Sequence, residues 1–265
     1  MSGTTTILQF ADVHFGVEDP EALRAVEKAE EEFGPDLVLI CGDITQTGSM
    51  DEFKAARDWV AGFAAPVVSM PGNHDAPYFQ PLARIFDPYG RYRKYIAPHC
   101  QDAFVDARVA VLPYNSARAI QAKLDWSVGV VNLGELDALL ARFDRDAAGR
   151  LHFLACHHPM VYPPEAPLDK ETQNGPEALR RLSDARADAV LSGHIHVPFV
   201  KDREPGQTGL LSIGAGTLSV RRRGYEPSFN LVEVAPDEVR VTAVEVVRGV
   251  FQRGATWRKP REAFA

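Results

Sequence analysis

The sequence predicts an α/β fold in which two sheets pack against each other and helices cover them on the outside. Short apolar runs alternate with helix-like stretches in both halves of the chain, and no linker separates the halves. Consecutive strands without helices close each half. With 265 residues, of which 45% are hydrophobic, the chain can bury one large core, so we expect a single domain over residues 1–265.

The first half alternates strands and helices. The stretch 20–33 places Leu23, Val26 and Ala29 on one helical face and ends at Gly34-Pro35, while 37–41 is apolar throughout, as in a strand buried on both faces. A β-α-β-α-β order implies parallel strands joined by right-handed crossovers. The expected elements are strands at 7–11, 37–41 and 66–70 and helices at 20–33 and 51–63.

The second half repeats this alternation. Around 92–113, and again from 209 to 248, the pattern is instead one of consecutive strands without helices. Ala235-Pro236-Asp237-Glu238 forms the turn of an expected hairpin. The expected elements are helices at 132–143 and 176–185, strands at 151–156 and 189–192, and hairpin strands at 228–234 and 239–247.

The last segment, 248–265, is a basic tail that carries Phe251, Trp257 and Phe264 among Arg and Lys. Aromatic side chains in such a tail favour contact with an apolar surface. We expect the tail to pack on the body of the protein or on another subunit, and the second alternative makes the protein a homodimer.

Composition excludes several classes of protein. The chain has 29 Lys and Arg against 36 Asp and Glu, a net charge of −7, which argues against an extended basic surface for nucleic acid. No apolar run approaches the roughly 20 residues of a membrane helix, and the N-terminus lacks the basic residues of a signal peptide. We therefore expect a cytoplasmic protein. Cys41, Cys100 and Cys156 form no C-x-x-C pair, and the first and last end apolar runs, which is typical of buried thiols.

Metal-ligand types of side chain follow five of the expected strands. In open α/β sheets, the loops at the carboxyl ends of strands are where sites form. A lone D-x-H or Gly-Asp is more often an ordinary turn, but five such strand ends together favour a metal site. The residues concerned are Asp12 and His14, Asp43, Asn73 with His74 and Asp75, His157, and His194 with His196.

These donors indicate the chemistry of the site. Oxygen and imidazole ligands without thiolate suit Mn, Fe, Co, Ni or Zn. Seven donors are too many for one ion with an open position, and suit two ions that share a carboxylate, the arrangement used for in-line displacement at phosphorus by a bridging hydroxide. His74, beside Asn73, is left free to protonate or stabilise a leaving oxygen, and Asp75 would hold its imidazole in one tautomer. His99, His152 and His158 are interpreted as structural or surface residues.

The ordered series D-V-H, G-D-I-T-Q-T-G, G-N-H-D, H-H-P and G-H-I-H over residues 12–196 resembles the calcineurin-like metallophosphoesterases. The resemblance implies a four-layer α-β-β-α sandwich of two mixed sheets flanked by helices. It also implies two divalent ions, with Mn, Fe or Zn ahead of Co or Ni. The implied ligands are Asp12, His14 and His196 for the first ion, Asn73, His157 and His194 for the second, and Asp43 between them, with His74 as the acid or charge stabiliser.

The second motif resembles most the bacterial branch, which includes class III cyclic-nucleotide phosphodiesterases and glycerophosphodiesterases. Gln46-Thr47 stands where protein serine/threonine phosphatases have Asp-Arg, and Gln46 where purple acid phosphatases have a metal-binding Tyr. Thr45 stands where the UDP-diacylglucosamine pyrophosphohydrolases and the double-strand-break nucleases have Phe. The resemblance thus implies hydrolysis of small phosphodiesters. A phosphomonoesterase, a nucleotide pyrophosphatase and a non-catalytic metal-dependent phosphate-binding protein stay open as alternatives.

Three further residues are candidates for substrate contact. Asn115 and Arg118 follow the strand at 109–112, although a plain loop explains them equally well. Arg222, in the Arg221–Arg223 cluster, would bind an anionic substrate, and the alternative is a solvated hairpin tip.

Overall fold

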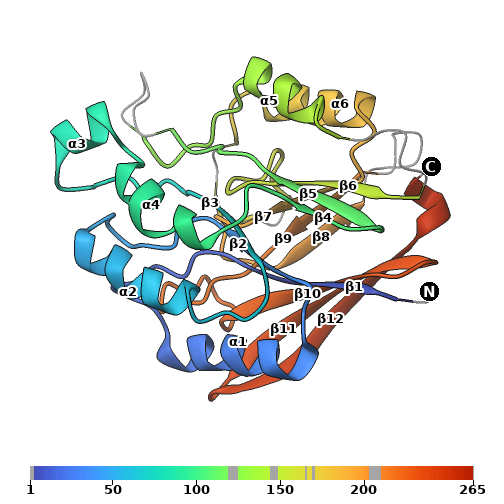
Figure 1. Ribbon diagram of the computed structural model, residues 1–265, viewed down its shortest axis with the longest axis horizontal. Helices are drawn as coiled ribbons and strands as arrows, with labels where there is room; N and C mark the ends of the chain where they lie inside the picture. Colours follow the sequence, from blue (N-terminus) through green and yellow to red (C-terminus); the bar gives the residue numbers. More distant parts are fainter. Residues whose placement is uncertain are drawn as a thin grey trace.

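Two six-stranded mixed sheets lie face to face, with helices on both outer faces (Figure 1). The computed structural model describes residues 3–118, 125–143, 149–164, 166–168, 171–202 and 210–264. This confirms the predicted layers of helix, sheet, sheet and helix.

The first sheet has the order β12-β11-β10-β1-β2-β3. β1, β2 and β3 are parallel, as the β-α-β-α-β pattern predicts, and β10 pairs antiparallel with β1. The predicted hairpin is confirmed as β10 and β11. The strand bounds are β1 (Thr5–Phe10), β2 (Leu37–Cys41), β3 (Val67–Met70), β10 (Ser228–Val234), β11 (Glu238–Val247) and β12 (Val250–Pro260).

The second sheet has the order β4-β5-β6-β7-β9-β8, in which β5, β6, β7 and β9 are parallel. Both sheets therefore direct the carboxyl ends of a parallel run toward one edge, which positions the candidate site. The strand bounds are β4 (Phe104–Val105), β5 (Val109–Pro113), β6 (Leu151–Ala155), β7 (Ala189–Ser192), β8 (Phe199–Asp202) and β9 (Leu211–Gly214).

Helices cover the outer faces of the sheets (Figure 1). α1 (Pro20–Phe33) and α2 (Met50–Val60) pack on the first sheet, and α5 (Leu133–Leu140) and α6 (Gly175–Asp184) pack on the second. Local signals fix the helix ends: Asp19 caps α1, Gly34 closes it at φ 52°, and Ser49 with Glu52 forms a capping box for α2. None of the helices in the described ranges is long and apolar enough to cross a membrane.

The space between the sheets is filled by the inward-facing side chains of both. Ile7 and Leu39 of the first sheet share a buried cluster with Val111 and Phe153 of the second. Because strand side chains alternate, Leu8 and Phe10 point the other way, under the helices. Cys41 and Cys156 are buried free thiols, as expected, and Cys100 is partly buried.

One prediction about secondary structure is wrong. The region 92–113 is not all strand, because α4 (Gly90–Tyr95) and the 3-10 turn Ala97–His99 precede β4 and β5, and α3 (Pro81–Phe86) lies just before them. The final segment packs on the body of the protein, which is one of the two expected alternatives, because it forms β12, paired antiparallel with β11, and the 3-10 turn Arg261–Phe264.

Candidate metal centre

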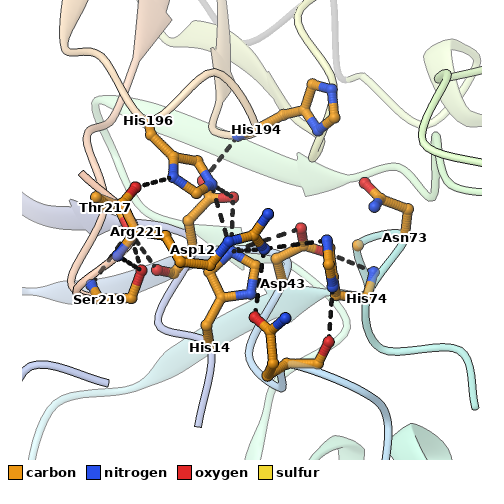
Figure 2. Close-up of polar contacts among 12 residues, drawn as sticks. Asp12, His14, Asp43, Asn73, His74, His194, His196, Thr217, Ser219 and Arg221 are labelled. Atoms are coloured by element: carbon orange, nitrogen blue, oxygen red, sulfur yellow. Dashed lines mark hydrogen bonds and ion pairs between the residues drawn. The ribbon is translucent and has the colours of Figure 1, made fainter. Parts of the chain in front are cut away.

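Loops after five parallel strands bring the predicted ligands together at one edge of the two sheets (Figure 2). Loops following β1, β2 and β3 of the first sheet meet loops following β6 and β7 of the second. Every predicted ligand is buried, with at most 8% of its surface exposed. The ligands are Asp12, His14, Asp43, Asn73, His157, His194 and His196.

A first group surrounds Asp12. Its Oδ1 lies 3.1 Å from Nε2 of His196 and 3.7 Å from Nε2 of His14, and the two imidazole nitrogens are 3.3 Å apart. Its other oxygen, Oδ2, accepts a hydrogen bond of 2.7 Å from the backbone N–H of His194. One carboxylate therefore lies close to two histidines and anchors the loop that carries His194.

A second group surrounds His157. Its Nε2 lies 3.2 Å from Asp43 Oδ2, 3.2 Å from Asn73 Oδ1 and 3.3 Å from His194 Nδ1. Its Nδ1 donates to the carbonyl of Cys41 at 2.8 Å, because a carbonyl can only accept. This bond turns Nε2 toward the other donors, as metal-binding histidines require. Asp43 lies between the groups, since its Oδ2 is also 4.0 Å from Nε2 of His14.

The backbone at these loops is strained. Asp12, His14, Asp43, His194 and His196 all have positive φ, between 51° and 71°, a region that costs most non-glycine residues about 1–2 kcal/mol. The strained loops are fastened to each other: the N–H of Asp12 donates to Gly42 and that of His14 to Asp43. The fold thus holds these side chains in positions that local preference alone would not give.

The donor set fits divalent cations. Asp12 Oδ1 and His14 Nδ1 are buried, and no hydrogen bond reaches either within the described part of the chain. Burial raises the pKa of Asp43, but the neighbouring His157 and His74 lower it by more than burial raises it. The pKa of Asp43 is therefore well below the usual range. Burial lowers the pKa of His157, yet Asp43 and Asp12 raise it to about 9. Both observations describe a buried, negatively charged centre that favours positive charge.

His74 lies at the rim of this centre. Its backbone N–H donates to Asp43 Oδ1 at 2.8 Å, and its Nδ1 donates to the carbonyl of Gln46 at 2.6 Å. The ring meets that of His14 edge-on, with centroids 4.8 Å apart. Nε2 therefore faces the centre, where a leaving group would lie.

Asp75 has a different role from the predicted one. Its buried carboxylate accepts from the backbone N–H groups of Gly72, Thr45 and Ile44 and from the hydroxyl of Thr45, and it does not contact the His74 ring. The backbone turns the Asp75 side chain beneath the loop, and the Gln46 carbonyl holds the His74 tautomer instead. Burial, followed by the charge of Asp43, raises the pKa of Asp75 to about 6.

His158 is a buried structural residue, one of the two roles that the sequence predicts for it. Its ring lies 4.4 Å from that of His194, and its nitrogen can join His157 and His194 in a group of three potential ligands. Nδ1 and Nε2 are already engaged by Ser116 Oγ and the Ser127 carbonyl, and burial, with His157 next, lowers the pKa of His158 to about 3. His158 is thus a neutral residue packed behind two predicted ligands. In the sequence, the position of His158 next to the predicted ligand His157 indicates that it lies near the centre.

The predicted substrate-binding residues lie outside the centre in this structure. Asn115 Oδ1 accepts from the N–H of Ala117, and Arg118 pairs with Glu135 at 2.6 Å. Arg222 pairs with Asp19 and Glu226, so its guanidinium points away from the ligands. Its neighbour Arg221 occupies the centre instead, 3.1 Å from Nε2 of His74.

Comparison with known proteins agrees with this geometry. The chain is 28% identical over 248 residues to a probable cyclic nucleotide phosphodiesterase of Synechococcus sp., covering 88% of this chain and 89% of the relative. It is 26% identical over 249 residues to the 3',5'-cyclic adenosine monophosphate phosphodiesterase CpdA of Escherichia coli, covering 87% and 82%. A dimetal phosphatase from Danio rerio has the same fold, with a TM-score of 0.70 at 14% identity over 97% of this chain and 99% of that one. Residues 5–198 match the family described as Calcineurin-like phosphoesterase, so the chain belongs to that family and is a hydrolytic phosphoesterase.

Proposed function

We propose that this protein hydrolyses small phosphodiesters, with 3',5'-cyclic nucleotides as the first candidates, at a centre that holds two divalent cations. One observation carries the proposal: two buried groups of imidazole and oxygen donors lie on either side of a shared carboxylate, Asp43. Two cations so placed are the arrangement suited to displacement at phosphorus.

Asp12, His14 and His196 would hold one cation, and Asn73, His157 and His194 the other. Each group combines nitrogen and oxygen donors, and the groups of potential ligands found among the described residues include no thiolate. Mn, Fe or Zn, followed by Co or Ni, suit such donors. When bound, the cations would neutralise phosphoryl oxygens and lower the pKa of a coordinated water that supplies the nucleophile.

The chain's own residues perform the remaining work. The Cys41 and Arg221 carbonyls accept from Nδ1 of His157 and His196, which keeps both Nε2 atoms turned inward. The Gln46 carbonyl does the same for His74. As an imidazolium, with its Nδ1 proton on the Gln46 carbonyl, His74 would donate its Nε2 proton to the departing oxygen or stabilise the charge of that oxygen.

The choice of cyclic nucleotides is supported by the relatives. Both relatives described above are named for cyclic nucleotides, and the alignments extend over more than four fifths of each chain. Glycerophosphodiesters are the next candidates. A phosphomonoesterase or nucleotide pyrophosphatase with the same site would be distinguished by the substrates it prefers.

The test is a metal analysis followed by a substrate panel on protein loaded with each cation in turn. We expect two equivalents of cation, and a kcat/KM for cyclic AMP or another cyclic nucleotide at least tenfold above that for p-nitrophenyl phosphate. Faster cleavage of phosphomonoesters would replace this proposal with a phosphomonoesterase. Absence of turnover with all five metals would leave a phosphate-binding protein.

We also propose that the protein is cytoplasmic, which cell fractionation tests. A homodimer formed through residues 248–265 is tested by sedimentation, in which a monomer would contradict it.

A further inference from the structure

Arg221 lies inside the centre although it is not a predicted ligand. Its Nη1 is 3.1 Å from Nε2 of His74 and 3.4 Å from Nε2 of His14, and it donates to Gln46 Oε1 at 3.3 Å. Figure 2 shows the Arg221 guanidinium beside the imidazoles of His14 and His74. It therefore occupies the space between a predicted cation ligand and the residue predicted to meet the leaving group.

This guanidinium has no anionic partner. In the parts of the chain that the structure describes, no carboxylate forms an ion pair with Arg221, whereas adjacent Arg222 has two, Asp19 and Glu226. Arg221 is half-buried, and removing a charge from water without an opposite charge is costly. Imidazole and amide groups orient the guanidinium but do not neutralise it. Under the proposed function the nearby carboxylates, Asp12 and Asp43, are ligands of the cations, so the anion that pairs with Arg221 would come from the substrate.

The backbone fixes the position of Arg221 relative to the ligands. Its carbonyl accepts from Nδ1 of His196 at 2.8 Å, and its N–H donates to Ser219 Oγ. Thr217 Oγ1, on the same segment, donates to the carbonyl of Asp12 at 2.7 Å. The segment that carries Arg221 thus also orients one predicted ligand and anchors the loop of another.

We infer that Arg221 binds the scissile phosphate directly, donating to a non-bridging oxygen on the side where His74 faces the leaving group. The inference rests on the proposed function. Two cations would repel a guanidinium beside them unless an anion lies between. A phosphate group in that position would attract the guanidinium and both cations at once. The planar fork of Arg suits phosphate oxygens.

Arg223 supports the same orientation of the segment. It is half-buried like Arg221, while Arg222 between them is exposed. Burial lowers the pKa of Arg223, and the negative charge of Asp12 offsets part of that effect, which places Arg223 within electrostatic range of the centre. The face of this segment that meets the centre is therefore positively charged.

The experiment compares Arg221→Ala, Arg221→Lys and Arg222→Ala. The control is Arg57→Ala, at a partly exposed arginine on α2 that pairs with Asp58. Each protein is loaded with metal, analysed for metal content, titrated calorimetrically with inorganic phosphate, and assayed with bis(p-nitrophenyl) phosphate. For Arg221→Ala we expect unchanged metal content, at least tenfold weaker phosphate binding, and kcat/KM lower by about 100-fold, as for loss of one preorganised donor. Arg221→Lys should have a phosphate affinity and a kcat/KM between those of Arg221→Ala and the unaltered protein, because lysine keeps the positive charge but lacks the planar pair of donors.

Three results would overturn the inference: phosphate binding by Arg221→Ala within twofold of the unaltered protein, loss of metal from Arg221→Ala, or a larger loss in Arg222→Ala than in Arg221→Ala. The phosphate titration does not depend on turnover. If the unaltered protein cleaves no phosphodiester, the proposed function fails, while weaker phosphate binding by Arg221→Ala would still support the phosphate contact.

Discussion

Asp12, His14, Asp43, His194 and His196 are both buried and held at positive φ. Buried polar groups and left-handed backbone each cost free energy, so their coincidence at five residues around one point does not serve stability. Among the described residues, the other non-glycine positions with positive φ are Asn174, Arg186 and Arg248. Strain concentrated at the centre is typical of a functional site, where the surrounding fold must enforce the geometry.

At the scale of single residues, substitutions of Asp43 and His74 should have different effects on metal content and on kcat. Asp43→Asn removes the charge that both groups of donors share, so we expect loss of bound metal and a fall in kcat of at least about 100-fold. His74→Ala should keep its metal but lose kcat by about 100-fold or more on substrates with poor leaving groups. Metal analysis and kinetics with p-nitrophenyl and alkyl diesters separate the two.

His99→Ala, at an exposed histidine, is the control for this pair and should behave like the unaltered protein. Full activity of His74→Ala on alkyl diesters would contradict its role at the leaving group. Full metal content in Asp43→Asn would contradict a shared carboxylate.

At the scale of elements, the site depends on loops that approach one another closely. A Cβ added at Gly72, after β3, would overlap the carboxylate and backbone nitrogen of Asp43, after β2. The same glycine donates its N–H to Asp75. The two loops can therefore lie side by side only because residue 72 has no side chain.

Gly72→Ala should displace Asp43 without removing any ligand. We expect lower metal affinity and a kcat/KM reduced by about 100-fold, because small displacements in an active site have effects of that size. Gly134→Ala is the matched control, since an added Cβ there meets only Asn132 Oδ1 at 3.5 Å. Calorimetric titration with Mn²⁺ and steady-state kinetics measure both variants, and equal behaviour of the two would contradict the steric argument.

The elements that sequence reasoning missed were decided by packing. Tyr92, Tyr95 and Ile96 have β-forming side chains, but the structure buries Tyr92 and Ile96 one helical turn apart and stacks Tyr95 on Phe53 of α2. β12 was missed because most of its residues are exposed and it shows no buried alternation. Pairing with β11 stabilises it, and a hydrogen-bonded partner cannot be read from the strand itself.

At the scale of the whole molecule, the two sheets share one buried cluster, and the centre lies across both. Asp12, Asp43 and Asn73 come from loops of the first sheet, whereas His157, His194 and His196 come from the second. Neither sheet holds a full set of donors alone. Metal binding and the association of the sheets are therefore coupled.

We expect one cooperative unfolding transition for the full chain, as for a single domain. Each cation that binds only the folded protein at 100 times its Kd adds about 2.7 kcal/mol to the free energy of unfolding. Two independent cations would add about 5.4 kcal/mol and raise Tm by about 10–20 °C for a chain of this length. Differential scanning calorimetry with and without a chelator measures this shift, and Asp43→Asn should abolish most of it. Two separate transitions would contradict the single-domain prediction.

The sequence by itself determined the strands β1, β2, β3, β5, β6 and β7, the capped helices α1 and α2, and the residue types at the strand ends. These depend on local periodicity, caps and motif spacing, which neighbouring residues specify. Only the tertiary structure decided that Arg221 rather than Arg222 enters the centre. It also decided that Asp75 bonds to the backbone of the loops and not to the His74 ring, and that His158 packs behind the predicted ligands. The direction of a side chain in a loop depends on which distant groups offer it hydrogen bonds and space, and those groups come together only when the two sheets pack.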